Sequence, residues 1–219
     1  MIPRFLLAVI ALGILVHLPV VHAQSLRLQQ AGTGESSASL RLGDTLTVEI
    51  IADLGTLEAS GTSVFISIPD GPFQVIDVAP SRDGVQPFFP GPLFASAAEF
   101  ANSLVSLQET PSLFTGRRLL DYSVSLGSRQ ERQRTGAGVI ASFRLIGVEP
   151  VEKAQISIDD SPIRQTRLVL PGGPVERPYQ ILEGMFVNTR AIDLKDIPGR
   201  KADRVVGVPE VKAYIDARE

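Results

Sequence analysis

Hydrophobic and polar residues alternate along most of this chain with a period of two, which is typical of β-strands that bury one face. The segments that show this alternation, or are rich in β-forming residues, are Leu26–Gln30, Thr45–Ala52, Ser63–Ile68, Phe73–Val78, Arg118–Leu126, Val139–Leu145, Gln155–Ile158, Arg167–Leu170 and Met185–Val187. In the four clearest segments, the residues predicted to face the core are Leu46, Val48, Ile50 and Ala52; Val64, Ile66 and Ile68; Leu120, Tyr122, Val124 and Leu126; and Val139, Ala141, Phe143 and Leu145.

Short turn sequences rich in Gly, Pro and Asp separate these segments, at residues 42–44, 69–72, 82–84, 136–138 and 171–174. Such residues tolerate a positive φ or fix φ near −65°, as tight turns require. Many short strands without intervening helices predict an all-β fold, in which two antiparallel sheets pack face to face as a β-sandwich.

The segment Val85–Ser112 interrupts this pattern with several prolines and with Phe88, Phe89, Phe94 and Phe100. Its second half has both helical and strand-like spacing, so the pattern leaves both open. The phenylalanines suggest either an exposed recognition patch or a flap that seals one end of the core, and we favour the flap. In the first case, Phe88, Phe89 and Phe94 are the candidate binding residues.

The two ends of the chain differ from the central segment. Residues 1–23 contain Arg4 followed by an apolar run that is shorter than a bilayer span, which indicates a cleavable signal peptide. The alternation covers residues 24–190, the predicted domain, and residues 191–219 follow it as a charged tail or linker, or as the start of another module. We therefore expect a secreted, periplasmic or cell-surface protein without a membrane span after signal cleavage.

The composition excludes most catalytic chemistry. The chain has no Cys, and both of its histidines, His17 and His22, lie in the predicted signal peptide. A mature protein without His or Cys has no Ser-His-Asp or Cys-His nucleophile and no His-ligated zinc. The formal net charge of −3 gives no electrostatic reason to expect nucleic-acid binding. We therefore expect a protein that is not an enzyme and carries no cofactor.

The remaining candidate chemistry lies in charged and aromatic clusters. Asp159 and Asp160 precede Ser161-Pro162, which is typical of a solvated turn. The alternative is that they contribute to a Ca²⁺ site. Catalysis by paired carboxylates is the least supported interpretation. An arginine-rich stretch is interpreted as solvated strand ends and a hairpin loop, and contains Arg117, Arg118, Arg129, Arg132 and Arg134. Glycan binding has few aromatic platforms to use, because the chain has no Trp.

The order of the segments resembles bacterial cohesin modules. Leu42–Val48, which reads LGDTLTV, is similar to the opening strand of those modules, and Gly61–Val78 is similar to the pair of strands that follows. Leu119–Leu126 and the GAGVIASFRL text of Gly136–Leu145 resemble their late strands, and Gly184–Val187 the closing strand.

This resemblance covers roughly residues 26–190 and implies a jelly-roll sandwich of about nine strands, related to carbohydrate-binding modules. Cohesins bind dockerin modules through one sheet face. The resemblance therefore implies a non-catalytic module that binds a dockerin-like or envelope protein outside the cytoplasm. The alternative is a carbohydrate-binding module of an extracellular polysaccharide-handling system.

Overall fold

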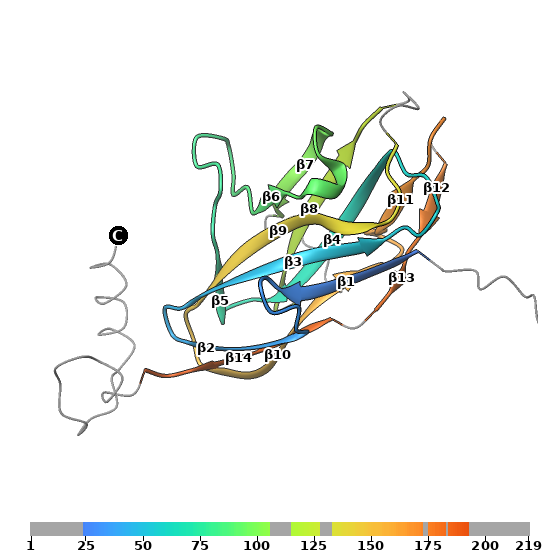
Figure 1. Cartoon of the computed structure of the whole chain (residues 1–219). Helices are drawn as coiled ribbons and strands as arrows, with labels where there is room; N and C mark the ends of the chain where they lie inside the picture. The colour runs from blue at the N-terminus through green and yellow to red at the C-terminus, as the bar shows by residue number, and fades with distance from the viewer. Residues whose placement is uncertain (1–23, 106–114, 128–132, 173–174, 183, 193–219) are drawn as a thin grey trace, which may run out of the picture.

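The computed structural model describes residues 24–105, 115–127, 133–172, 175–182 and 184–192 (Figure 1). The predicted signal peptide, most of the predicted tail, and Arg129 and Arg132 lie outside these residues. Two β-sheets face each other and enclose one main hydrophobic core. The predicted β-sandwich is therefore confirmed. Within the described residues, no helix is long and apolar enough to span a membrane.

The smaller sheet has six strands, in the order β13-β1-β3-β9-β5, and β6 also pairs with β9. Most of its pairs are antiparallel, but β1 and β13 are parallel. Its strands are β1 (Ser25–Gln30), β3 (Thr45–Asp53), β5 (Phe73–Val75), β6 (Phe88–Pro90), β9 (Ala137–Gly147) and β13 (Gln180–Ile181).

The larger sheet has eight strands, and its long central strand β4 pairs with β8 on one edge and with β10 and β11 on the other. Strand β7 extends the sheet beyond β8, while β14 and then β2 extend it beyond β10. Its strands are β2 (Ser37–Arg41), β4 (Gly61–Pro69), β7 (Ala98–Leu104), β8 (Arg117–Ser125), β10 (Val151–Asp159), β11 (Arg167–Val169), β12 (Glu176–Pro178) and β14 (Met185–Arg190).

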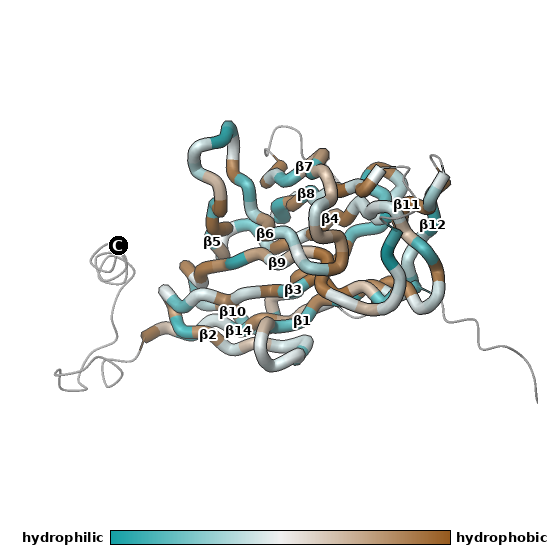
Figure 2. The backbone as a smooth tube through the Cα atoms, turned by 45° about the horizontal axis from the view of Figure 1, so that its top comes forward, coloured by the Kyte–Doolittle hydropathy of each residue, from teal (hydrophilic) through white to brown (hydrophobic). Residues whose placement is uncertain are grey.

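The core contains the residues that the alternation predicts, with one exception. Figure 2 shows hydrophobic and hydrophilic residues alternating along strands of both sheets. The exception is Val139, which is only partly buried, whereas its neighbour Ile140 is buried. The pairing of β3 with β9 shifts there, because Ile50 lies opposite Ala141 and Ile51 opposite Val139. Ile140 is therefore the extra residue of a β-bulge, which reverses the facing of the residues before it.

The Pro- and Phe-rich segment contributes two strands and a 3-10 helix, η2 (Pro92–Phe94). Phe100 and Leu104 lie on strand β7, so of the two alternatives that the spacing left open, the strand is the one that forms there. Phe88 and Phe94 are buried in the core, as the flap interpretation predicts. The segment passes very close to β9, where a Cβ on Gly91 would lie 2.3 Å from the carbonyl oxygen of Val139.

Asn102 on β7 connects this segment to the larger sheet. Its side-chain amide donates a hydrogen bond to the carbonyl of Phe88, and its Oδ1 accepts one from the Phe88 N–H, both at 2.9 Å. Phe88 in turn packs against Tyr122 of the larger sheet and Phe143 of the smaller one, with ring centroids 5.1 and 5.5 Å apart. This cluster therefore joins the two sheets through both polar and aromatic contacts.

Candidate functional site

The outer face of the smaller sheet is covered by long side chains that contact one another. The Arg27 guanidinium donates to Gln29, which donates to the Glu49 carboxylate at 2.9 Å. The Arg144 guanidinium lies over the Phe89 ring, 4.8 Å from its centroid. These contacts satisfy part of the polarity of the face internally.

The outer face of the larger sheet differs, because its centre consists mainly of short hydroxyl side chains. We call this surface the serine face and define it by the outward residues of β4, β8 and β10: Ser63, Phe65, Ser67, Asp121, Ser123 and Ser157. In the strand register, Ser63 lies opposite Ser123 and Ser67 opposite Ser157. The Ser63 and Ser123 hydroxyls are hydrogen-bonded at 2.9 Å. Part of this face is covered, because Ser67 is 3% exposed and its register partner Leu119, which also points outward, is fully buried beside Val105.

Arg117 lies across the serine face and connects its three strands. From β8, its guanidinium donates to the hydroxyl and the carbonyl of Ser67 on β4, and to the Gln155 carbonyl and the Ser157 hydroxyl on β10. Burial lowers the pKa of this guanidinium, while the Asp159 carboxylate raises it. The side chain is thus fixed in one orientation.

A second charged group lies around Phe65. The Arg164 guanidinium lies 5.6 Å from the centroid of the Phe65 ring, and its Nε is buried without a hydrogen-bond partner. Asp121 lies opposite Phe65 in the register, and burial raises the pKa of its carboxyl, although Arg164 and the Ser123 hydroxyl lower it. The face therefore presents an aromatic ring between a cation and a poorly solvated carboxylate.

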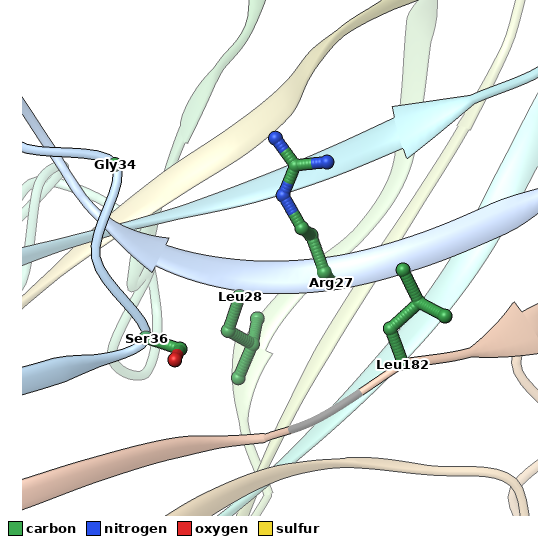
Figure 3. A pocket seen from close by; sticks show the side chains of 5 residues that line it. All are labelled: Arg27, Leu28, Gly34, Ser36 and Leu182. Carbon is green, nitrogen blue, oxygen red and sulfur yellow. The ribbon is translucent and has the colours of Figure 1, made fainter.

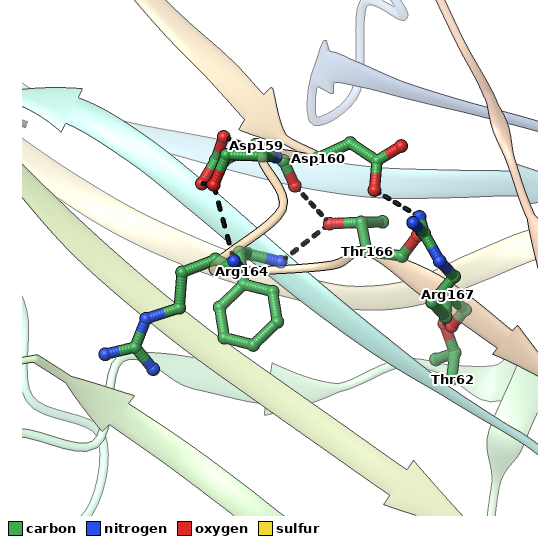
Figure 4. Close-up of polar contacts among 8 residues, drawn as sticks. Thr62, Asp159, Asp160, Arg164, Thr166 and Arg167 are labelled. Carbon is green, nitrogen blue, oxygen red and sulfur yellow. Dashed lines mark hydrogen bonds and ion pairs between the residues drawn. The ribbon is translucent and has the colours of Figure 1, made fainter. Parts of the chain in front are cut away.

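The Asp159-Asp160 pair forms a turn that closes against the edge of this face (Figure 4). The Asp159 carboxylate accepts hydrogen bonds from the backbone N–H and the hydroxyl of Ser161, and Asp160 forms an ion pair with Arg167. Thr166 is fully buried beneath the turn and donates to the Asp159 carbonyl at 2.6 Å. Both aspartates thus have local partners, as a turn requires.

No group of three or more metal-ligating side chains is placed to hold an ion among the residues that the structure describes. The proposal of a Ca²⁺ contribution from Asp159 and Asp160 therefore gains no further ligand there.

Of the three candidate phenylalanines, only Phe89 is accessible, with 37% of its surface exposed. Phe88 and Phe94 are buried, which removes them as contact residues, because a buried ring cannot reach a ligand. Tyr122 and Tyr179 are also buried, and burial raises the pKa of both phenols. They are therefore core residues rather than platforms for a sugar.

The described surface includes two grooves. One, of about 330 Å³, lies between β1 and the entrance to β2 and is lined by Arg27, Leu28, Gly34, Ser36 and Leu182 (Figure 3). The other, of about 390 Å³, runs beside the edge strand β7 and includes the exposed Phe100.

The fold is similar to that of solved cohesin domains. A type II cohesin from the cellulosome of Acetivibrio cellulolyticus matches with a TM-score of 0.55 and 16% identity, over 76% of this chain and 95% of that one. Type II cohesin A11 from Bacteroides cellulosolvens matches with a TM-score of 0.56 and 13% identity, over 76% and 99%.

A further match is the third cohesin of ScaC from Acetivibrio cellulolyticus, solved in complex with the ScaB dockerin. Its TM-score is 0.52 at 11% identity, over 76% of this chain and 98% of that one. No family model and no curated protein matches the sequence. The structural matches establish that this chain has a cohesin-like fold.

The sequence did not identify Arg117, or the pair of Arg164 and Phe65, as site residues. Arg164 comes from the β10–β11 turn and lies over Phe65 of β4, while Arg117 reaches from β8 to β4 and β10. The one available signal was the run of serines on the polar side of β4 and β8, which the alternation placed outside the core.

Proposed function

We propose that this chain is a non-catalytic module that binds a protein partner through the serine face. The observation that carries the proposal is a cohesin-like fold whose larger sheet gathers hydroxyls, an aromatic ring and two positioned arginines on its outer face. Arginines and aromatic rings are the residue types that contribute most to protein interfaces.

The proposed partner is a dockerin-like or envelope protein, met outside the cytoplasm. The cohesin of ScaC was solved with a dockerin, which supports this class of partner by analogy of fold. The predicted signal peptide supports the proposed secreted, periplasmic or cell-surface location.

Matched Ser→Arg substitutions test the proposed face. Ser123 on β8 and Ser142 on β9 are both half-buried serines in the middle of long strands, on the outer sides of opposite sheets. Immobilised protein is used to capture partners from the envelope and culture fractions of the producing organism, and the affinity of the captured protein is then measured. We expect Ser123→Arg to weaken binding by about tenfold or more, because a bulky cation in the middle of the interface keeps the two surfaces apart. This corresponds to a loss of roughly 1.4 kcal/mol or more of binding free energy.

Ser142→Arg is the control and should bind as the unsubstituted protein does. Equal affinity of both variants, or a loss confined to Ser142→Arg, would contradict the proposed face. Saturable binding to a glycan array without any protein partner would instead favour the carbohydrate-binding alternative.

A further inference from the structure

The serine face carries charges of both signs. Arg117 and Arg164 lie on it together with Asp121, and the Asp159 carboxylate interacts with Arg117. Arg41 and Arg190, which are cross-strand neighbours, are exposed on the same outer side at the β2–β14 edge.

The hydrogen bonds of Arg117 all go to neutral acceptors, namely two serine hydroxyls and two backbone carbonyls. Its Nη1 donates to no described residue. The Asp159 carboxylate raises the pKa of the guanidinium, but Arg117 forms no ion pair with a described carboxylate.

The surroundings of Arg117 are suited to a carboxylate. The Ser157 hydroxyl accepts from the Arg117 guanidinium at 3.4 Å, so its own proton is directed elsewhere and is available to a ligand. A carboxylate placed over the guanidinium receives charge-assisted hydrogen bonds from Nη1 and from this hydroxyl. Since the guanidinium is already held by β4 and β10, little further side-chain entropy is lost on binding.

We infer that Arg117, together with Ser157, binds an acidic side chain of the protein partner, so that the partner's contact surface is acidic. This inference rests on the proposed function, because it assigns a partner chemistry to the same face. The cohesin-like fold favours a protein segment over an acidic sugar as the occupant. Phe186, which is 42% exposed and lies opposite Gln155 in the register, is a ring beside this site on which a sugar can stack, so the test includes an acidic sugar.

The test uses capped hexaglutamate as the probe, hexaglutamine as the neutral control and an oligogalacturonate as the acidic sugar. Binding to the isotope-labelled protein is followed by NMR at low salt, through the side-chain Nε–H signals of the arginines. We expect saturable binding of hexaglutamate that shifts the Arg117 signal. Arg117→Gln should weaken it about tenfold, as expected for a charge-assisted contact.

Arg144→Gln is the matched control, because Arg144 is an outward strand arginine of the opposite face. It should change the affinity less than about twofold, well below the effect of a lost charged hydrogen bond. If Arg117→Gln does not fold, Ser157→Ala removes only the hydroxyl and should weaken binding by a smaller factor.

Three results would overturn the inference: no saturable hexaglutamate binding, equal weakening by Arg144→Gln, or tighter binding of the oligogalacturonate. The proposed function is tested separately. If Ser123→Arg abolishes capture of the partner while hexaglutamate does not bind, the serine face remains the interface and only the acidic chemistry of the partner is refuted.

Discussion

Asn102 should be the polar side chain whose loss costs the fold most, and Asn102→Ala tests this. The residue is 7% exposed, and its amide satisfies both the N–H and the carbonyl of Phe88 while also donating to Glu99 at 3.0 Å. Truncation leaves two buried backbone groups without partners. Each costs about 1–3 kcal/mol, so the free energy of unfolding should fall by about 2–6 kcal/mol.

Urea denaturation followed by far-UV circular dichroism measures this loss, with the slope against urea expected to stay unchanged. Asn188→Ala is the control. Asn188 is exposed on β14, and its Oδ1 accepts one hydrogen bond from the Lys153 N–H, which water can replace. This control should cost about 0.5 kcal/mol or less. A loss for Asn102→Ala below about 1 kcal/mol, comparable to the control, would refute the argument that Asn102 joins the two sheets.

Two further substitutions test the core and the serine face. Phe143→Ala removes a fully buried ring that packs edge-on against Phe88 and should cost about 3–5 kcal/mol in the same urea assay; an unchanged midpoint would contradict its place in the core. Asp121→Asn should stabilise the protein at neutral pH, because burial raises the folded-state pKa of Asp121, so that its ionisation costs stability as pH rises through that pKa. Below the ordinary carboxyl pKa of 3.8 the stabilisation should vanish, and melting temperatures that differ equally at every pH would contradict this cause.

The long strands were predictable from sequence because each buries one face, which imposes a strict period of two. Strands β3, β4 and β8 follow this period over most of their nine residues, so the inward residues predicted in them are buried. Ile51, Ser67 and Leu119 depart from it, because they point outward and are buried as well. The period fails where the geometry of the strand changes. The bulge at Ile140 turns Val139 away from the core. In β7 the pairing is irregular between Glu99 and Ala101, so the apolar residues of that strand do not alternate regularly and also fit helical spacing.

Other strands were missed because their sequence resembles loops. Strand β2, which reads SASLR, has only Ala38 and Leu40 to bury, and β6 lies among prolines. Strands β12 and β13 have only three and two residues, too few to show a period. Their pairing depends on partners distant in the sequence, which no local pattern specifies.

The candidate site was less predictable than the fold. The alternation placed the serines of β4 and β8 outside the core, but not in contact with one another. Arg117 was interpreted as part of a solvated strand end, whereas it reaches across β4 to β10, through contacts between residues 38 to 50 positions apart. Such contacts follow from the strand register, which the sequence alone left undetermined.

The most direct test of the proposed interface is a crystal structure of this chain with its captured protein partner. We predict that the partner covers Ser63, Ser123 and Arg117, burying roughly 800 Å² on this chain, as in a standard interface, and that one of its Asp or Glu side chains lies against Arg117. A partner seated on Arg144 and Phe89, on the opposite sheet, would contradict the account.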